Sequence, residues 1–371
     1  MESSPSNEEQ IDGLRVEIDS LDLQILSLLD KRFEVVKQIG QLKQESGAAI
    51  YRPDRERCIL ERLLGEARKL GLANLNKERI DSIFGEIFGV ALNIEEPQRI
   101  AFLGPLGSFC HQAAEIKFGP LSSYIPVNNI PAIFDSLNNG AAKYGVLPLE
   151  NNTNGMVGES IDNLARHSFK IVSEVVLDIH QSFASQASRL QDIHRIYSRD
   201  IAFGQCHDFI NNYDLHEVEQ VAVSSTARAA KLASQDKNSA AICSSIAAKL
   251  YGLPLLFKRI ETAPNNQTRF VIISDFCNPR APGHKTSVFV TIKDFERPGA
   301  LFTLLKDFTE ENINITKIDS RPLHEGSGFR SGFYLDFQGH REDPNVARIF
   351  AKRGEEIKWL GSYPLYEYPR G

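Results

Sequence analysis

The chain has 371 residues, of which 42% are hydrophobic and 24% charged, and this balance predicts an ordinary soluble protein of two or three domains. Its net charge of −6 comes without a basic block, which argues against a nucleic-acid binder. No apolar run has the length of a membrane span, and the acidic, polar start resembles neither a secretory signal nor a transit peptide. The five cysteines are far apart and form no CxxC pair, so we expect a reducing, cytoplasmic location and no metal site.

Residues 14–44 are predicted to form one long helix, because apolar side chains recur at helical spacing and no proline interrupts the run. Gly40 is the only weak helix former in it, and Ser6 with Glu9 offers a capping box upstream. Such a helix is about 45 Å long at about 1.5 Å per residue. That length exceeds what one small domain can cover, so we expect a partner helix.

The cations of this helix stand in unusual positions. Arg32 and Lys43 fall on the apolar stripe, whereas Arg15 is rotated roughly 100° away from Arg32, towards a neighbouring helix. Cations that reach to water from the edge of a bundle would explain this pattern. The alternative is a bundle interior that holds a small dianion.

Two further helices are predicted at 54–70 and 77–95, each with one apolar side. Glu95 falls on the apolar stripe of the second of these helices. A buried carboxyl group there would have a raised pKa and could remain protonated as a hydrogen-bond donor. The alternative is a solvated side chain at a fraying helix end.

Residues 8–96 resemble the all-helical chorismate mutase domain through the pattern LRxEIDxLDxxILxLLxxR, the later lysine and YRPDRE. The resemblance implies that Arg15, Arg32 and Arg55 bind the substrate carboxylates. In that family two chains exchange the long helix, so Arg15 would serve the partner's site. We therefore expect a homodimer with exchanged N-terminal helices.

The same resemblance implies that Lys43 and Glu95 hydrogen-bond the ether oxygen of chorismate, while Glu56 meets its hydroxyl group. The rearrangement of chorismate to prephenate is pericyclic, so it requires no nucleophile and no cofactor. The protein must hold a compact conformer and stabilise the developing charge. Many relatives carry glutamine in place of Glu95, and a glutamate must be protonated to donate. We therefore expect mutase activity to favour mildly acidic pH and Glu95→Gln to flatten the profile.

After a short polar linker the pattern changes, and residues 97–277 read as strands alternating with helices. This alternation predicts two α/β lobes with parallel sheets, covered on both faces, and a ligand cleft between them. A helix is expected at 203–213. The last strand, 268–274, is expected to return to the first lobe.

Polar clusters fall where such a cleft would lie. The loop 104–108 could present backbone N–H groups to an anion, although it lacks the lysine of a P-loop. Thr226 opens a helix and Thr268 opens an apolar strand, where capping and a simple strand start are the plainer explanations.

Residues 99–277 together resemble prephenate dehydratase. The matching motifs, in chain order, are GPLGSF, YGVLPLENNTNG, YS at 197–198, QC at 205–206, SST at 224–226 and NQTRF at 266–270. The resemblance implies that Thr268 is the general acid that protonates the departing hydroxyl group, with no metal. The other residues that it implies bind substrate or line the cleft are Ser108, Asn151, Ser198, Gln205, Thr226, Arg269 and Phe270.

Residues 278–284 are a proline- and glycine-bearing linker, and the segment 285–371 follows the order strand, helix, strand, strand, helix, strand. That order is the ferredoxin-like α+β plan. Two of its loops resemble those of the ACT amino-acid-binding domain, which implies L-phenylalanine as effector. The residues so implied are Gly299, Ala300, Leu301, Asp319, Ser320, Arg321 and Pro322. The alternative is a dimerisation module that binds nothing.

The sequence therefore predicts a multidomain chain: an all-α mutase domain at 1–96, a two-lobed, periplasmic-binding-protein-like α/β dehydratase domain at 97–277, and an ACT domain at 285–371. Its small-molecule ligands would be chorismate, prephenate and L-phenylalanine, without nucleic acid, membrane or cofactor. Two alternatives remain: a monofunctional dehydratase with a helical dimerisation domain, and a non-catalytic solute-binding or amino-acid-sensing protein.

Overall fold

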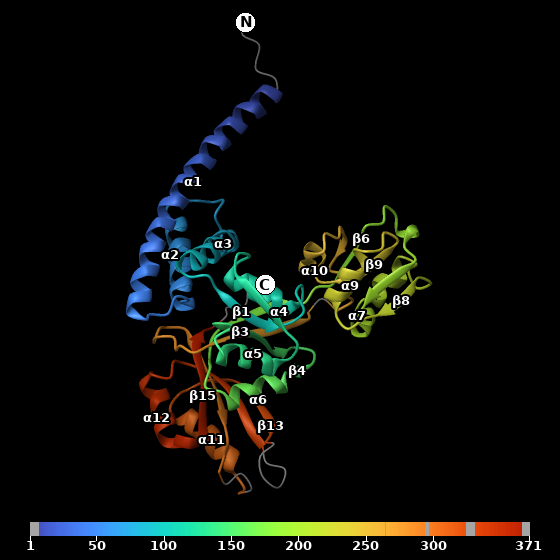
Figure 1. Ribbon diagram of the computed structural model, residues 1–371. Coiled ribbons are helices and arrows are strands. Elements are labelled where there is room, and N and C mark those ends of the chain that lie inside the picture. Colours follow the sequence, from blue (N-terminus) through green and yellow to red (C-terminus); the bar gives the residue numbers. More distant parts are fainter. Residues whose placement is uncertain (1–6, 264, 294–296, 324–330, 366–371) are drawn as a thin grey trace.

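The computed structural model of the chain describes residues 7–263, 265–293, 297–323 and 331–365 (Figure 1). A helical segment, two sheets with flanking helices and a third, four-stranded sheet follow one another along the chain. No helix among these residues is long and apolar enough to cross a membrane.

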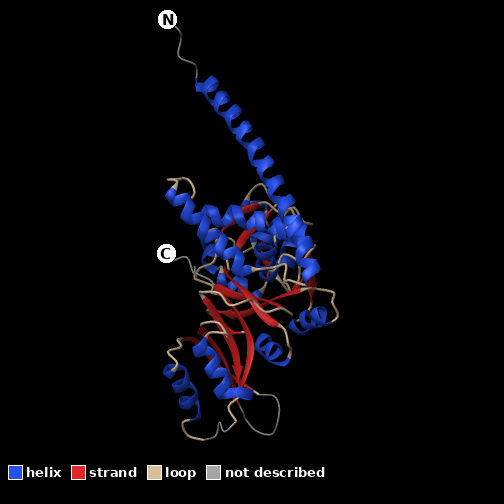
Figure 2. Ribbon diagram, turned by 90° about the vertical axis from the view of Figure 1, so that its left-hand side faces the viewer, coloured by secondary structure: helices blue, strands red, loops and turns tan. Residues whose placement is uncertain are grey.

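Three helices form the first segment: α1 (Asn7–Ser46), α2 (Pro53–Lys69) and α3 (Lys77–Glu95). The prediction of α3 is confirmed at both ends, and that of α2 to within one residue. Ser6, part of the predicted capping box, lies outside the described residues. The N-terminal part of α1 extends away from the rest of the molecule, as Figures 1 and 2 both show.

The helical segment shares a hydrophobic core with the first sheet. Tyr51, in the α1–α2 connection, is fully buried, and its ring lies 5.1 Å from that of Phe118 and 5.6 Å from that of Tyr144. The α3 helix approaches α4 through Gly89 and Gly119, where a Cβ on either residue would meet the other backbone at 2.8–2.9 Å. These helices are therefore packed onto the next part of the chain.

The first sheet has the order β2-β1-β3-β11-β5, and β4 pairs with the end of β3. Its strands are β1 (Arg99–Leu103), β2 (Ser123–Val127), β3 (Tyr144–Asn151), β4 (Gly155–Met156), β5 (Lys170–Asp178) and β11 (Gln267–Ser274). Its helices are α4 (Phe109–Phe118), α5 (Ile130–Asn138) and α6 (Gly158–Arg166). One apolar cluster fills each face of this sheet.

The return of the last strand to the first lobe is confirmed, because β11 lies between β3 and β5. It is antiparallel to both neighbours, whereas β1 is parallel to β2 and β3. The prediction of parallel sheets is therefore wrong in part, and this sheet is mixed. The chain re-enters from the second lobe, so β11 needs no crossover helix and runs opposite to its neighbours.

The second sheet has the order β10-β6-β9-β7-β8 and is mixed as well. Its strands are β6 (Ser182–Ser185), β7 (Arg195–Ser198), β8 (Glu219–Ala222), β9 (Ser239–Cys243) and β10 (Leu255–Lys258). Its helices are the 3-10 turn η1 (Leu190–Asp192), α7 (Asp200–Gln205), α8 (His207–Asn212), α9 (Thr226–Ala233) and α10 (Ser245–Leu250). The single helix predicted at 203–213 is wrong. Two short helices replace it, because Cys206 between them leaves the helical conformation with φ −116° and ψ 20°.

The third sheet is antiparallel throughout, in the order β13-β14-β12-β15. Its elements are β12 (His284–Val290), α11 (Ala300–Glu310), β13 (Ile315–Pro322), β14 (Ser331–Gln338), α12 (Pro344–Arg353), the 3-10 turn η2 (Gly354–Glu356) and β15 (Ile357–Pro364). The predicted ends of two strands, at 329–330 and 366, lie outside the described residues. Strand β15 crosses β5 closely at Gly361, and Lys170 donates to the Trp359 carbonyl at 2.9 Å. The third sheet thus packs against the first.

Candidate active sites

Lys43 and Glu95 meet at the C-terminal ends of α1 and α3. The Lys43 Nζ lies 2.6 Å from Glu95 Oε2 and also donates to the Ile50 carbonyl at 3.1 Å. The two helices come together here because Gly40 has no side chain: a Cβ on it would lie 2.9 Å from the Glu95 Cα. A cation and a carboxylate thus form a half-buried pair at the predicted position of the ether oxygen.

Arg32 lies eleven residues before Lys43 on α1. Its guanidinium is 5.8 Å from the centre of the Phe88 ring. Burial lowers the pKa of Arg32, although Glu95 acts in the opposite direction. Among the described residues, its buried Nη1 has no hydrogen-bond partner. An unpaired buried donor is costly, so this group is suited to an anionic ligand.

Glu56 faces inward from α2, and burial raises its pKa to about 7, although Lys117 of α4 lowers it. Arg55 is exposed, and Arg15 pairs with Asp12 at 3.0 Å on the exposed part of α1. Arg15 is seventeen residues from Arg32, about 25 Å at about 1.5 Å per residue. The structure therefore brings Arg32, Lys43, Glu56 and Glu95 to one region of a single chain, but not Arg15.

A second polar group lies where β3 and β11 end side by side. The Asn151 Nδ2 donates to Thr268 Oγ1 at 2.9 Å and to Asn266 Oδ1 at 2.7 Å. The Asn151 Oδ1 accepts from two backbone N–H groups, those of Thr153 and Asn154, at 3.0 Å each. These contacts fix the amide, so the Thr268 oxygen accepts from it. The hydroxyl hydrogen of Thr268 therefore remains available for donation.

The loop 104–108 lies against the second lobe. Ser108 caps α4, accepting from His111 N and donating to the Leu103 carbonyl, and Ser244 donates to the Gly107 carbonyl at 2.8 Å. A Cβ on Gly107, whose φ is +82°, would lie 3.1 Å from Ala247. Thr226 is the first residue of α9, behind the N-cap Ser225. The loop and the N-termini of α9 and α10 therefore face one another.

The remaining predicted dehydratase residues make other contacts. Ser198 is fully buried and donates to the Ile242 carbonyl at 2.8 Å, while Phe270 is buried in the core. Gln205 accepts from Thr262 N through its backbone carbonyl. Hence Ser198 and Phe270 have structural contacts here, and the predicted substrate contacts from them stay predictions.

Arg269 lies away from Thr268. Its side chain leaves β11 on the face opposite to Thr268 and lies in a buried ion network with Glu174 and Asp336. Alternation along a strand explains this, because adjacent side chains point to opposite faces. Its contacts in this structure are therefore structural, and its assignment as a substrate ligand stays a prediction.

A cavity of ≈ 370 Å³ lies at the two connections between the lobes. It is lined by Asn152, Asp178, His180, Arg259, Glu261, Asn265 and Gln267. Asn152 and Gln267 are the chain neighbours of Asn151 and Thr268, but neither member of that pair lines the cavity. Sequence reasoning missed Asn266 and His111, although both stand within or beside the quoted motifs.

The implied effector residues lie at the start of α11 and on the edge strand β13. Gly299 has φ +84° immediately before α11, a conformation that favours glycine, and its carbonyl accepts from Thr303 N at 2.8 Å. Asp319 and Ser320 belong to β13. Arg321, on the same strand, pairs with Asp162 of α6 at 2.9 Å. In this structure Arg321 thus links the third sheet to α6.

Comparison with protein families gives two matches. Residues 14–96 match chorismate mutase type II, and residues 100–277 match prephenate dehydratase. A bifunctional chorismate mutase/prephenate dehydratase of Stutzerimonas stutzeri is 37% identical over 370 residues, covering 97% of this chain and 99% of that protein. That of Escherichia coli K12 is 31% identical over 379 residues, covering 97% of each chain.

Two solved structures resemble about three quarters of the chain. A prephenate dehydratase from Arthrobacter aurescens in complex with L-Phe has a TM-score of 0.64 and 29% identity, covering 73% of this chain and 93% of that one. A protein described as a quorum quenching acylase, GqqA, has a TM-score of 0.66 and 28% identity, covering 74% of this chain and 100% of that one.

These matches and the two polar groups define an enzyme with two catalytic parts, an isomerase and a lyase. The chain belongs to the bifunctional chorismate mutase/prephenate dehydratase family.

Proposed function

We propose that the chain converts chorismate to prephenate in the helical segment and prephenate to phenylpyruvate between the two lobes, with L-phenylalanine as feedback inhibitor. The domains would be 1–96, 97–277 and 285–371, in a cytoplasmic homodimer. The observation that carries the proposal is the occurrence of two separate polar groups, Lys43 with Glu95 and Asn151 with Thr268, in the two matched regions.

In the mutase step, the half-buried cations would hold the substrate dianion in its reactive conformer. Arg32 has an unpaired buried donor for a carboxylate. Lys43 would donate to the ether oxygen as its bond to carbon breaks, which stabilises charge where it develops. Glu95, when protonated, would donate a second hydrogen bond to the same ether oxygen. Arg15, from the partner's exchanged α1, and Arg55 would complete the carboxylate contacts.

In the dehydratase step, Thr268 would give its hydroxyl proton to the departing ring hydroxyl, which leaves as water, and Thr268 would then take a proton back from solvent. The carboxylate leaves as carbon dioxide, and the electron pair of the broken carbon–carbon bond completes the aromatic ring. Asn151 supports this role because its amide donates to the Thr268 oxygen, so the Thr268 proton points elsewhere. Ser108 and Thr226 would orient the substrate from the facing helix starts.

The third sheet would be an ACT domain of the ferredoxin-like class. Its βαββαβ order and its antiparallel strand order β13-β14-β12-β15 support this assignment. The effector would bind near Gly299 and Asp319. The related Arthrobacter aurescens enzyme, solved with L-Phe, supports phenylalanine as the ligand.

The homodimer would form through α1. Large apolar side chains on its N-terminal part are exposed, among them Leu14 (61%), Leu21 (49%) and Leu28 (65%). A contiguous exposed apolar stripe on a projecting helix marks an interaction surface. A second copy would cover it and would bring Arg15 to the partner's site.

The test is to incubate the purified chain with chorismate and to follow prephenate and phenylpyruvate, with and without L-phenylalanine. We expect both products in sequence. We also expect L-phenylalanine, but not glycine, to slow the second step by about fivefold or more, the usual lower range of allosteric coupling. Absence of either conversion would contradict the catalytic proposal, and indifference to L-phenylalanine would contradict the sensor.

A further inference from the structure

The two strands that carry the candidate dehydratase residues present a second matched pair on their opposite face. Thr268 is in register with Asn151, and Arg269 is in register with Glu150. Side chains alternate along each strand, so Thr268 and Asn151 lie on one face while Arg269 and Glu150 lie on the other. Contacts that fix Arg269 and Glu150 therefore also fix the backbone of Thr268 and Asn151.

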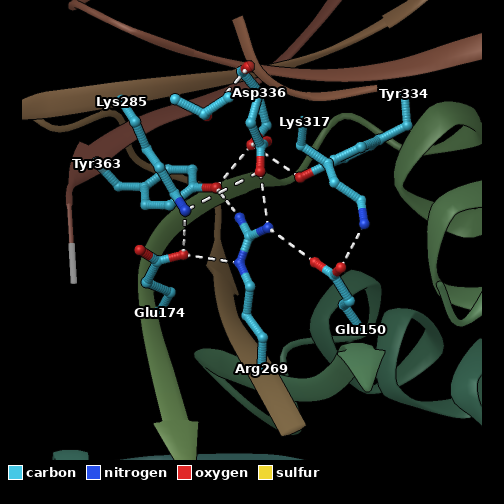
Figure 3. A network of polar contacts seen from close by, with 10 residues as sticks. Glu150, Glu174, Arg269, Lys285, Lys317, Tyr334, Asp336 and Tyr363 are labelled. Atoms are coloured by element: carbon cyan, nitrogen blue, oxygen red, sulfur yellow. Dashed lines mark hydrogen bonds and ion pairs between the residues drawn. The ribbon is translucent and has the colours of Figure 1, made fainter. Parts of the chain in front are cut away.

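Figure 3 shows what holds Arg269. Its Nε donates to Glu174 Oε2 of β5 at 2.8 Å, within the same sheet. Its other two nitrogens reach the third sheet: Nη1 donates to Asp336 Oδ2 of β14 at 2.7 Å, and Nη2 donates to the Tyr363 hydroxyl of β15 at 2.8 Å. All three guanidinium nitrogens are thus engaged, two of them by the third sheet.

The neighbours of this arginine complete the network. Lys285 of β12 lies 2.6 Å from Glu174 Oε2, and Lys317 of β13 pairs with Glu150, whose other oxygen lies 3.7 Å from Arg269 Nη1. Burial acts to raise the pKa of Asp336, but Arg269 and Lys285 hold it below its ordinary value. Three cations therefore face three carboxylates.

The network is buried rather than solvated. Arg269 is 7% exposed, Glu174 3%, Asp336 1% and Lys285 7%. Ions buried to this degree interact strongly only in one arrangement, and removing a single partner leaves an uncompensated charge. The contact between the first and third sheets is therefore fixed in geometry, and it cannot shift freely beneath β11.

We infer that Arg269 is a positioning residue for the dehydratase reaction, through which the third sheet, by way of Asp336 and Tyr363, fixes β11 and hence the Thr268 hydroxyl. The link between Lys317 and Glu150 gives the same support to Asn151 on β3. The third sheet is then part of the support of the dehydratase site and not only a place for an effector. The inference rests on the proposed role of Thr268.

The network also offers a route by which an effector bound to the third sheet could alter dehydration. Lys317 lies on β13, the strand that carries Asp319 and Arg321. A change in the position of β13 would reach Asn151 through Glu150. The same change would reach Thr268 through Asp336 and Arg269.

The test uses the full chain and a mild variant, Tyr363→Phe, which removes only the hydroxyl group that Arg269 Nη2 contacts. We expect kcat of the dehydratase step to fall by about tenfold while KM for prephenate stays within about twofold, because a small displacement of a catalytic group costs rate and not binding. Mutase activity, measured on the same preparation, should be unchanged. Lys317→Met, at the edge of the network, should give a smaller fall of the same kind.

The matched control is Lys358→Met. Lys358 also joins the third sheet to the first lobe, by donating to the Ala165 carbonyl of α6, but it lies outside the network. Its dehydratase kcat should equal that of the wild type. A raised KM with unchanged kcat in Tyr363→Phe would overturn the inference, as would an equal loss in Lys358→Met. Thr268→Ala, assayed alongside, separates the two ideas: if it remains active, the proposed role of Thr268 fails and the positioning inference fails with it.

Discussion

Glu56 and Glu95 are two carboxyl groups that face one region of the helical segment in different environments. Glu95 has a cation 2.6 Å away, in Lys43. Glu56 is half-buried, and its pKa is raised to about 7 because burial disfavours the charged form more than Lys117 favours it. The two groups therefore differ in what stabilises their charge. The flattened pH profile expected of Glu95→Gln stays a prediction.

The raised pKa of Glu56 predicts a pH dependence of stability. Its ordinary value is 4.5, so between about pH 4.5 and about 7 the folded chain binds a proton that the unfolded chain releases. The free energy of unfolding should therefore fall as the pH rises through this window. We expect Glu56→Gln to remove a fall of about 2 kcal/mol, since one pKa unit corresponds to about 1.4 kcal/mol and the group is partly exposed. Urea unfolding of both chains across the window measures this difference.

Glu61→Gln is the matched control, because Glu61 lies on the same helix with a 65% exposed side chain. It should keep the slope of the wild type. Equal slopes for the wild type and Glu56→Gln would show that Glu56 does not carry the raised pKa in solution.

At the scale of elements, α1 exposes more large apolar side chains than any other described helix or strand. Its N-terminal part projects from the molecule (Figure 2). Leucine and isoleucine side chains along this part are exposed. Burial of such side chains stabilises an assembly by about 25 cal/mol per Å² of apolar surface. The exposed stripe on this projecting helix therefore supports the proposed pairing with a second chain.

A charge on this stripe should separate the dimer and silence the mutase. Ile18→Glu places a carboxylate where apolar side chains would pack, so we expect monomers by sedimentation and a mutase loss of about a hundredfold, because Arg15 would no longer reach a partner's site. Dehydratase activity should persist.

Ser27→Glu adds the same charge about 140° round the helix from Leu14, at an exposed position, and should leave the assembly intact. A monomeric Ile18→Glu chain with full mutase activity would contradict the exchanged-helix site. A wild-type chain that is itself monomeric would contradict it too.

Much of this architecture could be predicted from the sequence, for identifiable reasons. The helices α2 and α3 follow from a 3.6-residue apolar period over many turns, which single sequences report well. The four-residue strands β6 and β10 were missed, because so short a run carries no clear period. The direction of β11 was missed as well, because it depends on β3 and β5, which are far away in the chain.

For the candidate sites, too, local motifs were informative and contacts between distant segments were not. The motif NQTRF led to the prediction of Thr268, but it could not tell that Arg269 turns to the opposite face and pairs with residues of the third sheet. Those partners, Asp336 and Tyr363, are 67 and 94 residues away and carry no local signal. Contacts between sheets are therefore what the sequence could not provide.

At the scale of the whole molecule, the parts of the chain are held together by buried apolar contacts and ion pairs, and not by the linkers alone. Tyr51 of the helical segment is buried against Phe118 and Tyr144 of the first lobe. Arg269 of the first lobe is buried against Asp336 of the third sheet. Each part is therefore a support for the next, although the two polar groups remain separate.

The central claim is that one chain carries two independent catalytic groups, and parallel assays of both conversions on the wild type, Lys43→Ala and Thr268→Ala test it most directly. Removing one charged donor should lower the mutase rate of Lys43→Ala by about a hundredfold or more, with the dehydratase spared. Removing the general acid should lower the dehydratase rate of Thr268→Ala by about a hundredfold or more, with the mutase spared. Loss of both activities in either variant, or full activity in both, would contradict the account.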